Sequence, residues 1–339
     1  MKAISLFSGV GGLDMGFERA GIETVLQAEQ DPWCLKVLAK HWPQTERVTD
    51  VRDVSQERAS AVIGRMGVVG AGRSGEHSER LRRGGREEHD AGIDLIYGGF
   101  PCQDVSVAGK RAGLDGERSG LWFEFERILS ELRPRWAVIE NVPGLLSSNK
   151  GRDFAVILDG LEDLGYSVGW AVLDAQNFGV PQRRRRVFIV AGATGRSVEQ
   201  VLSLCESCGG NPAPGSEAGA HVTNALDARA GGADDNEAQG GFLIPDLVGA
   251  LSDGAHHGGG TNGQDAYTGR VFPAVGGVRR LTPLECERLM GWPDDWTRWT
   301  AGGKEIADSH RYRMAGNGVV ASVAEWIGHR IVAVDGGLA

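Results

Sequence analysis

The chain has 339 residues, a formal net charge of −9 and 41% hydrophobic residues, which is the balance of an ordinary globular protein. No apolar run approaches the ~20 residues needed to cross a bilayer, and the apolar N-terminus is too short for a signal peptide. We therefore expect a cytoplasmic protein without a membrane partner, whose five cysteines are free thiols. The negative charge excludes a uniformly basic surface, but DNA binding needs only a local basic face.

Basic residues cluster at four places along the chain. These are Arg183–Arg186, Lys110-Arg111, Arg279-Arg280 and the pair Arg311 and Arg313. Any one such cluster is as often a solvated surface as a binding site, so composition alone leaves the partner open.

Short β-rich runs in the first half predict buried strands. They cover Ala3–Phe7, Thr24–Ala28, Asp94–Tyr97, Trp136–Glu140, Val168–Leu173 and Arg186–Ala191. Apolar residues at helical spacing predict helices between them, over Trp122–Leu132 and Phe154–Leu164. This alternation predicts an α/β fold, a Rossmann-like doubly wound and mostly parallel sheet with helices on both faces. Ligands of such sheets bind at the carboxyl ends of the strands.

Two stretches interrupt this pattern. Residues 67–92 are rich in Gly, Arg, Glu and Ser, which predicts an exposed, mobile insertion. Residues 192–278 carry many glycines and a faint internal repeat, which favours a smaller, irregular β-rich domain. Regular structure resumes at Thr282–Glu285, which has the form of a helix capping box with proline at the first helical position.

A glycine-rich turn, Phe7–Gly12, follows the first predicted strand and opens a helix. Glycines let a ligand approach the backbone, and the helix N-terminus favours an anionic group. The turn is not the dinucleotide fingerprint, because Asp14 occupies the third glycine position. Glu29 ends the second strand, where a carboxylate can grip ribose hydroxyls, and Asp50 lies beyond the next strand. The set suits an adenosine ligand, with a purely structural turn as the alternative.

Cys102 stands in the segment Gly98–Gln103 directly after a predicted strand. Most cysteines are small buried hydrophobes, and this interpretation suits Cys34 and Cys286 on predicted helices. Cys102 instead lies at the ligand-binding edge of the sheet, where a thiolate could attack a substrate.

Glu140 ends the strand that begins at Trp136, so its carboxyl group should be partly buried, with a raised pKa that retains a proton for donation. In the run Gln182–Arg186, which opens the last of these strands, alternate side chains share a face. Arg184 and Arg186 are therefore expected to point the same way.

Taken in order, these motifs resemble the DNA (cytosine-5)-methyltransferase family of bacterial and phage type. The ordered set is Phe-x-Gly-x-Gly-Gly, Gly-Phe-Pro-Cys-Gln, Glu-Asn-Val, Gln-x-Arg-x-Arg and the late Gly316-Asn317. The resemblance covers residues 1–66, 93–191 and 279–329. Each motif is moderately specific, and their order and spacing together are highly specific.

The resemblance implies a mechanism on double-stranded DNA. The target cytosine is flipped into the pocket, Cys102 attacks C6, and Glu140 contacts the N3 and N4 edge and relieves the charge that develops there. Arg184 would hold the base oxygen, and Arg186 would steady the pocket or the cysteine loop. C5 then takes a methyl group from S-adenosyl-L-methionine, and loss of its hydrogen expels the cysteine.

The resemblance also implies which residues bind the cofactor and the DNA. The cofactor residues are Phe7, Gly9, Gly11, Gly12, Glu29, Asp50, Val51, Pro101, Leu121 and Asn317, and the residues near DNA are Gln103 and Ser106. Residues 1–191 would form the catalytic and cofactor-binding domain and 192–278 the target-recognition domain, while 279–339 complete the small domain and return to the catalytic domain. A monomer is expected, with any cognate restriction endonuclease acting separately.

Some features depart from the family or suit other functions. Ser5 stands where many members carry an acidic residue, and residues 192–278 lack the expected Thr-Leu pair, which leaves the base-reading residues unidentified. Cys205 and Cys208 lack a second pair at zinc-finger spacing, so no metal is expected. The alternatives are an RNA cytosine methyltransferase, whose Cys-Phe-Thr signature is absent, and an inactive DNA-binding relative. A nicotinamide oxidoreductase fits the sheet but not the glycine spacing.

Overall fold

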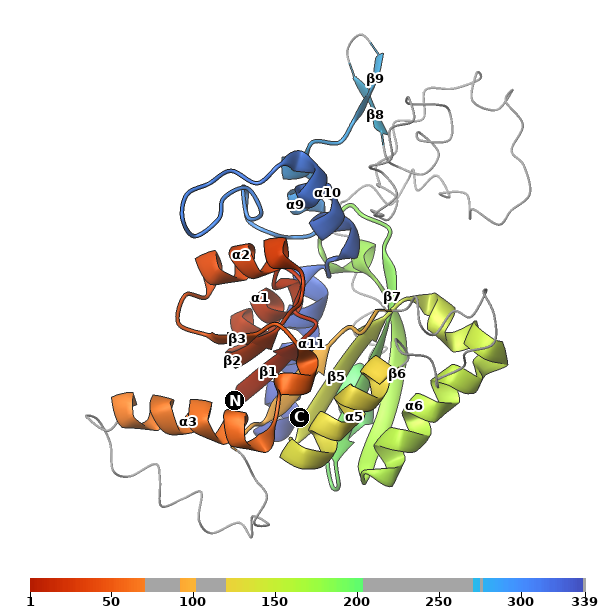
Figure 1. Cartoon of the computed structure of the whole chain (residues 1–339). Helices are drawn as coiled ribbons and strands as arrows, with labels where there is room; N and C mark the ends of the chain where they lie inside the picture. The colour runs from red at the N-terminus through yellow and green to blue at the C-terminus, as the bar shows by residue number, and fades with distance from the viewer. Residues whose placement is uncertain (71–91, 102–119, 204–270, 275–276, 338–339) are drawn as a thin grey trace.

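The computed structural model describes residues 1–70, 92–101, 120–203, 271–274 and 277–337 (Figure 1). Cys102, Gln103 and Ser106, and nearly all of residues 192–278, lie outside these ranges. None of the helices in the described ranges is long and apolar enough to span a bilayer.

Within the described residues, seven strands form one sheet in the order β3-β2-β1-β4-β5-β7-β6. The strands are β1 Lys2–Leu6, β2 Glu23–Ala28, β3 Glu46–Val48, β4 Leu95–Gly98, β5 Trp136–Asn141, β6 Tyr166–Asp174 and β7 Arg185–Ala193. The first five strands run parallel to one another, whereas β7 is antiparallel to both β5 and β6. The predicted mostly parallel α/β sheet is confirmed, and each of the six predicted strands lies within two residues of its predicted bounds. The strand-helix alternation stops at β6 because only a short 3-10 helix, η5 Ala175–Phe178, precedes β7, too little chain for a parallel crossover.

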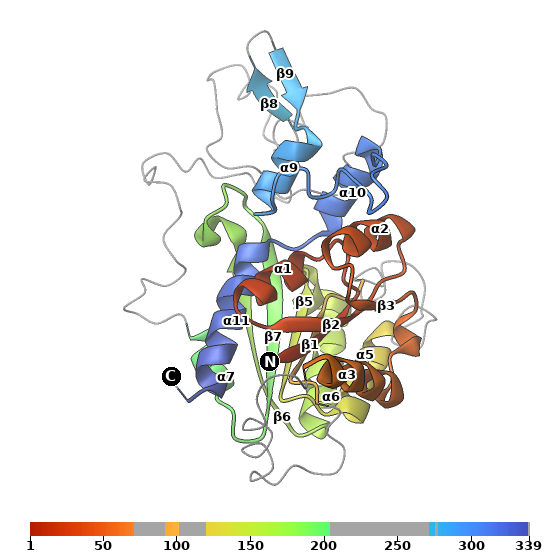
Figure 2. The ribbon, with the colours of Figure 1, turned by 90° about the vertical axis from the view of Figure 1, so that its left-hand side faces the viewer.

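Helices cover both faces of this sheet, as Figure 2 shows. One face carries α1 Gly12–Arg19, α7 Val198–Leu202 and α11 Ala321–Asp335, and the other carries α3 Gln56–Gly70, α5 Gly120–Leu132 and α6 Arg152–Asp163. Two separate hydrophobic cores result, since successive strand residues face opposite sides. In β5, for example, Trp136 and Val138 belong to one core and Ala137 and Ile139 to the other.

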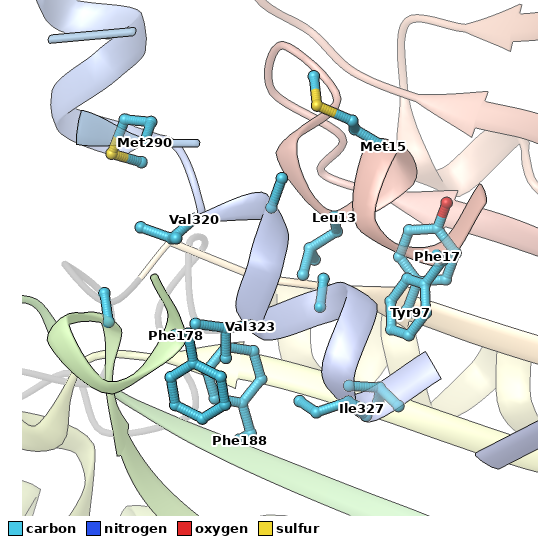
Figure 3. Packing of buried hydrophobic residues seen from close by; sticks show 14 of the residues in the cluster. Leu13, Met15, Phe17, Tyr97, Phe178, Phe188, Met290, Val320, Val323 and Ile327 are labelled. Atoms are coloured by element: carbon cyan, nitrogen blue, oxygen red, sulfur yellow. The ribbon is translucent and has the colours of Figure 1, made fainter. Parts of the chain in front are cut away.

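The C-terminal helix α11 packs directly on the N-terminal helix α1. A Cβ atom added at Gly16 would lie 2.3 Å from the Ala321 carbonyl oxygen, and one at Gly328 would lie 2.7 Å from Ala20 Cβ. Figure 3 shows Leu13 and Phe17 of α1 beside Val323 and Ile327 of α11, with Phe188 of β7 beneath. The end of the chain is thus part of the same core as its beginning.

Three further helices complete the cover near the carboxyl ends of the strands. They are α2 Pro32–His41, α9 Pro283–Leu289 and α10 Asp308–Asn317, and a hairpin of β8 Val271–Ala274 and β9 Gly277–Arg280 precedes α9 (Figure 1). The predicted capping box is confirmed: Thr282 Oγ1 accepts from the Glu285 N–H at 3.2 Å, and the Thr282 N–H donates to Glu285 at 2.7 Å.

The predicted insertion at 67–92 starts too early. Helix α3 continues to Gly70, so residues 67–70 extend a helix whose earlier turns pack on the sheet. Residues 71–91 lie outside the described ranges.

A buried polar cluster under the glycine-rich turn accounts for the serine at position 5. Asp14 is fully buried and accepts hydrogen bonds from Ser5 Oγ at 3.0 Å and from Gln27 Nε2 at 2.9 Å. Ser5 on the first strand therefore donates to an acidic residue on α1. Burial raises the pKa of Asp14 to about 6, against the hydrogen bonds from Gln27 and Ser5 that lower it.

We expect the variant Asp14→Asn to be more stable than the wild type above pH 6. Because the folded-state pKa of Asp14 is raised, its favourable contribution is complete below the unfolded pKa of 3.8 and is lost as pH rises through about 6. A shift of two units corresponds to about 3 kcal/mol in the free energy of unfolding. Urea denaturation from pH 4 to 8 should show the advantage of the variant growing from pH 4 through about pH 6 and then levelling off, with the exposed Asp53→Asn as control. An advantage independent of pH would contradict the assignment to Asp14.

Candidate active site

A cavity of 1070 Å³ opens at the carboxyl ends of the parallel strands, where the sheet topology predicts a ligand. It is lined by the residues that directly follow β1 to β4, by the end of β5, by the first turn of α5 and by the end of α10. Of the predicted site residues, those that line it are Phe7, Gly9, Glu29, Asp50, Val51, Pro101, Leu121, Glu140, Arg186 and Asn317.

The glycine-rich turn adopts left-handed backbone at Phe7, Gly9 and Gly11, with φ of 54°, 57° and 83°. The Gly9 N–H donates to Glu29 Oε2 at 2.7 Å, which ties the turn to the end of β2. Apart from its own chain neighbours, no atom of the described residues lies within 4 Å of the place where a Gly9 Cβ would stand, so the turn presents open backbone to the cavity.

Gly11 and Gly12 have a different role from the one predicted, because neither lines the cavity. A Cβ at Gly11 would lie 2.3 Å from the Trp42 ring, and one at Gly12 would lie 2.4 Å from the Val319 carbonyl oxygen. These two glycines permit close packing behind the turn.

Two carboxylates occupy the strand ends next to the turn. Burial raises the pKa of Glu29, although its Oε1 and Oε2 accept from the N–H groups of Asp31 and Gly9, each at 2.7 Å. Asp50 is more exposed and pairs with Arg52 at 2.7 Å, and hydrogen bonds from Arg52 lower the pKa of Asp50. The two carboxylates of the cavity therefore have pKa values shifted in opposite directions, upward for Glu29 and downward for Asp50.

Glu140 and Arg186 form an ion pair at the end of β5, with Arg186 Nε 3.0 Å from Glu140 Oε1. Both side chains are largely shielded from solvent, at 12% and 17% exposure. Burial raises the pKa of Glu140, and the charges of Arg186 and Arg184 oppose that rise. A Cβ at Gly99 would lie 2.6 Å from Glu140 Oε2, so a glycine at the end of β4 leaves room for the carboxyl group.

Asn141 is a cavity residue that sequence reasoning did not single out. Its Nδ2 donates to the Phe100 carbonyl at 3.2 Å, and its Oδ1 accepts from the Val142 N–H at 2.9 Å. It therefore fixes the backbone just before Pro101 and Cys102. Its place beside Glu140 in the same motif is the signal that could have identified it.

Arg184 and Arg186 occupy different positions, although the sequence predicts that both side chains face the pocket. Arg186 lines the cavity, whereas Arg184 is 2% exposed and does not. The Arg184 guanidinium donates to the carbonyl oxygens of Gly316 at 2.8 Å and Gly318 at 2.7 Å. Burial lowers the pKa of Arg184 to about 9, with Arg186 lowering it further and Glu140 opposing. The expectation that Arg184 contacts a base oxygen therefore does not fit its position.

The rim of the cavity joins α2 to α10. Asp31, which caps α2, pairs with Arg313 at 2.7 Å, and the rings of Trp33 and His310 stack at 4.3 Å. Cys34 lines the cavity and is half-buried, so its interpretation as a buried core residue is wrong.

Several of the other cysteines and basic residues singled out from the sequence are buried or lie outside the described residues. Cys286 is buried as expected. Arg311 is also buried and pairs with Glu287 at 3.1 Å, which removes it from the candidate basic surface. Cys205 and Cys208, the pair considered for zinc, lie outside the described residues, as do Lys110 and Arg111.

Comparison with known proteins decides the family. The sequence profile of C-5 cytosine-specific DNA methylases matches residues 1–207 and 249–333. The chain belongs to this family. It is a DNA cytosine-5 methyltransferase, which rules out the nicotinamide oxidoreductase that the sheet alone allowed.

Two bacterial proteins are similar to this methylase along nearly its whole length. The chain is 30% identical to type II methyltransferase M2.BsuMI of Bacillus subtilis (strain 168), over 98% of this chain and 75% of that protein. It is 28% identical to type II methyltransferase M.Bsp6I of Bacillus sp. (strain RFL6), over 98% of both.

Solved structures share the fold of this methylase. A putative DNA modification methyltransferase encoded within an E. coli prophage matches with a TM-score of 0.59 and 20% identity, over 99% of both chains. The S. pombe Dnmt2 methyltransferase matches with a TM-score of 0.62 and 16% identity, over 98% of both chains.

Proposed function

We propose that this DNA methylase takes its methyl group from S-adenosyl-L-methionine and acts on a flipped cytosine by covalent catalysis through Cys102. The observation that carries the proposal is a single cavity. It joins an open glycine turn and two strand-end carboxylates to a buried Glu140, whose pKa is raised by burial, beside Arg186.

The glycine-turn end of the cavity fits an adenosine ligand with a positively charged centre. Gly9 leaves space for a ligand against the backbone, and Phe7 and Leu121 offer apolar surface. The Glu29 oxygens each accept one N–H and keep a lone pair for a ribose hydroxyl. When bound, S-adenosyl-L-methionine supplies an electrophilic methyl group on a sulfonium.

The end of the cavity next to Glu140 suits the target cytosine. The Cys102 thiolate adds to C6 and forms a carbon–sulfur bond, while the electron pair displaced from the ring is accommodated by a proton that Glu140 donates at N3. C5 becomes nucleophilic and takes the methyl group. A base then removes the C5 proton, and the electron pair of the C5–H bond re-forms the C5–C6 double bond as the carbon–sulfur bond breaks and the thiolate leaves. The N3 proton returns to Glu140. Arg186, a donor-only group on the cavity wall, is placed to hold the base oxygen.

This chemistry requires the cytosine to leave the duplex, because a stacked base cannot reach a group at a strand end inside the cavity. We assign Gln103 and Ser106 to the DNA side of the Cys102 loop, and target choice to residues 192–278. Within that segment, the family match leaves out only residues 208–248 in the middle, which is where a part that differs between relatives is expected. The enzyme would act as a monomer, with any cognate endonuclease separate.

Transfer of tritium from labelled S-adenosyl-L-methionine tests the proposal directly. Purified protein should label duplex DNA, and base-resolution sequencing should place the product at one cytosine within a short recurring sequence. Labelling of RNA in preference to DNA would favour the RNA alternative. Failure on both, with a folded protein, would favour an inactive DNA-binding relative.

Glu29→Ala should weaken cofactor binding by about 1–3 kcal/mol through loss of a charge-assisted hydrogen bond. Calorimetry with S-adenosylhomocysteine measures this without turnover. Glu29→Gln, which can still accept from Gly9, should lose less. Glu23→Ala is the matched control, because Glu23 begins the same strand at the end far from the cavity and is exposed. Unchanged affinity in Glu29→Ala would move the ribose site elsewhere.

A further inference from the structure

The backbone strip Gly316–Val319, which ends α10, is held by side chains from distant parts of the chain. Arg184 Nη2 donates to the carbonyl oxygens of Gly316 at 2.8 Å and Gly318 at 2.7 Å. Trp292 Nε1 donates to the Val319 carbonyl at 3.1 Å. Carbonyls at a helix end lack intrahelical donors, and these two side chains supply them.

The strip is also confined sterically on both sides. A Cβ at Gly318 would lie 2.5 Å from the Trp292 ring, and one at Gly12 would lie 2.4 Å from the Val319 carbonyl oxygen. The strip is thus clamped between the glycine-rich turn and Trp292. Asn317, in the middle of it, is exposed and lines the cavity.

Arg184 is itself held in place. Its N–H donates to Asp174 Oδ1 at 3.0 Å, and its carbonyl accepts from the Ala175 N–H at 3.0 Å. Asp174 is the last residue of β6, and Ala175 is the first residue of η5. The guanidinium therefore extends from a fixed point of the sheet to the backbone on both sides of Asn317.

We propose that Arg184 and Trp292 are positioning residues for the cofactor: they hold the backbone that presents Asn317 to the cavity. The inference rests on the proposed use of S-adenosyl-L-methionine at this site. It gives Arg184 a role through Asn317 and leaves contact with the base to Arg186. If the proposal holds, cofactor binding depends on how the C-terminal segment, which carries Gly316–Val319 and follows residues 192–278, packs against Arg184 on the sheet.

A double-mutant cycle on cofactor affinity tests this proposal. The variants are Arg184→Met, Trp292→Phe and Asn317→Ala, and calorimetry with S-adenosylhomocysteine gives the dissociation constants. Trp292→Phe keeps an aromatic ring and removes the N–H donor. Arg185→Met is the matched control, because Arg185 is the exposed neighbour in the same run. Circular dichroism checks the fold of each variant.

If the proposal is correct, Arg184→Met should weaken binding roughly 10- to 100-fold and Trp292→Phe about threefold to tenfold. In the Asn317→Ala background, either change should weaken cofactor binding by less than about threefold, because the effects of coupled residues on affinity are not additive. Arg185→Met should bind as the wild type does. In steady state, the KM for the cofactor should rise more than kcat falls.

Additive effects with Asn317→Ala, or wild-type affinity in both positioning variants, would overturn the proposal. If Arg184→Met fails to fold, the Trp292→Phe cycle decides the question alone. A wild-type protein that binds no S-adenosylhomocysteine would instead refute the proposed cofactor. The two failures are therefore distinguishable.

Discussion

Replacing Cys102 with serine should abolish methylation and all covalent capture of DNA. Methyl transfer leaves a hydrogen on C5 that must depart before the thiol can leave. Fluorine at C5 cannot leave as a cation, so DNA with 5-fluorocytosine at the target should give the wild type a complex that survives boiling in detergent. Cys102→Ser should form none, because a hydroxyl is far less ionised than a thiol near neutral pH.

Cys34 provides the control for this experiment. Its thiol lines the cavity, but burial raises the pKa of Cys34, with Glu29 and Asp31 adding to the rise, so it is a poor nucleophile. Cys34→Ser should still form the detergent-resistant complex. Capture by Cys102→Ser, or no capture by a wild type that demonstrably methylates the same site, would exclude Cys102 as the nucleophile.

Glu140→Gln should slow methylation by roughly 10²–10⁴-fold, the usual cost of losing a general acid. Burial raises the pKa of Glu140, so the wild type retains the required proton at low pH and loses it as pH rises through that pKa. The decline in kcat on the alkaline side should disappear in the glutamine variant, because an amide does not titrate there. The complex with 5-fluorocytosine DNA should still form, but more slowly.

The matched control is Glu131→Gln, a surface carboxylate on α5 paired with Arg127. It should leave kcat and its pH profile unchanged. Glu140→Gln could also disturb Arg186, its ion-pair partner, so Arg186→Lys is a useful companion: it keeps the charge and loses the fork of donors. Glu140→Gln with wild-type kcat would remove Glu140 from the proton-transfer step.

Much of the candidate site was predictable because its chemistry follows strand ends. Glu29 and Glu140 each come directly after, or end, a buried apolar run, and parallel strands bring their carboxyl ends to one edge. The structure places both on one cavity. Local pattern also predicted the bounds of α5 and α6 closely, since an apolar stripe and a terminating proline or glycine are properties of a single segment.

The arginine run shows where such reasoning stops. Alternation predicts that Arg184 and Arg186 share a face, and the charges of both act on Glu140. It does not predict that the Arg184 guanidinium donates hydrogen bonds to the carbonyl oxygens of Gly316 and Gly318. Those two residues lie more than a hundred positions away in the sequence, and only folding brings them close to Arg184. For this reason the sequence alone assigned the base oxygen to Arg184, whereas the position of Arg186 on the cavity wall favours Arg186 for that contact.

The sequence by itself determined the family, the mostly parallel sheet and the strand-end acids, because each depends on short segments whose spacing and polarity are read directly. Only the tertiary structure decided that Gly12 packs on Val319, that Asp14 receives the hydrogen bond of Ser5, and that β7 runs antiparallel. These features depend on contacts between residues far apart in the chain. Burial and partners set hydrogen bonding and pKa, and both are properties of the folded neighbourhood.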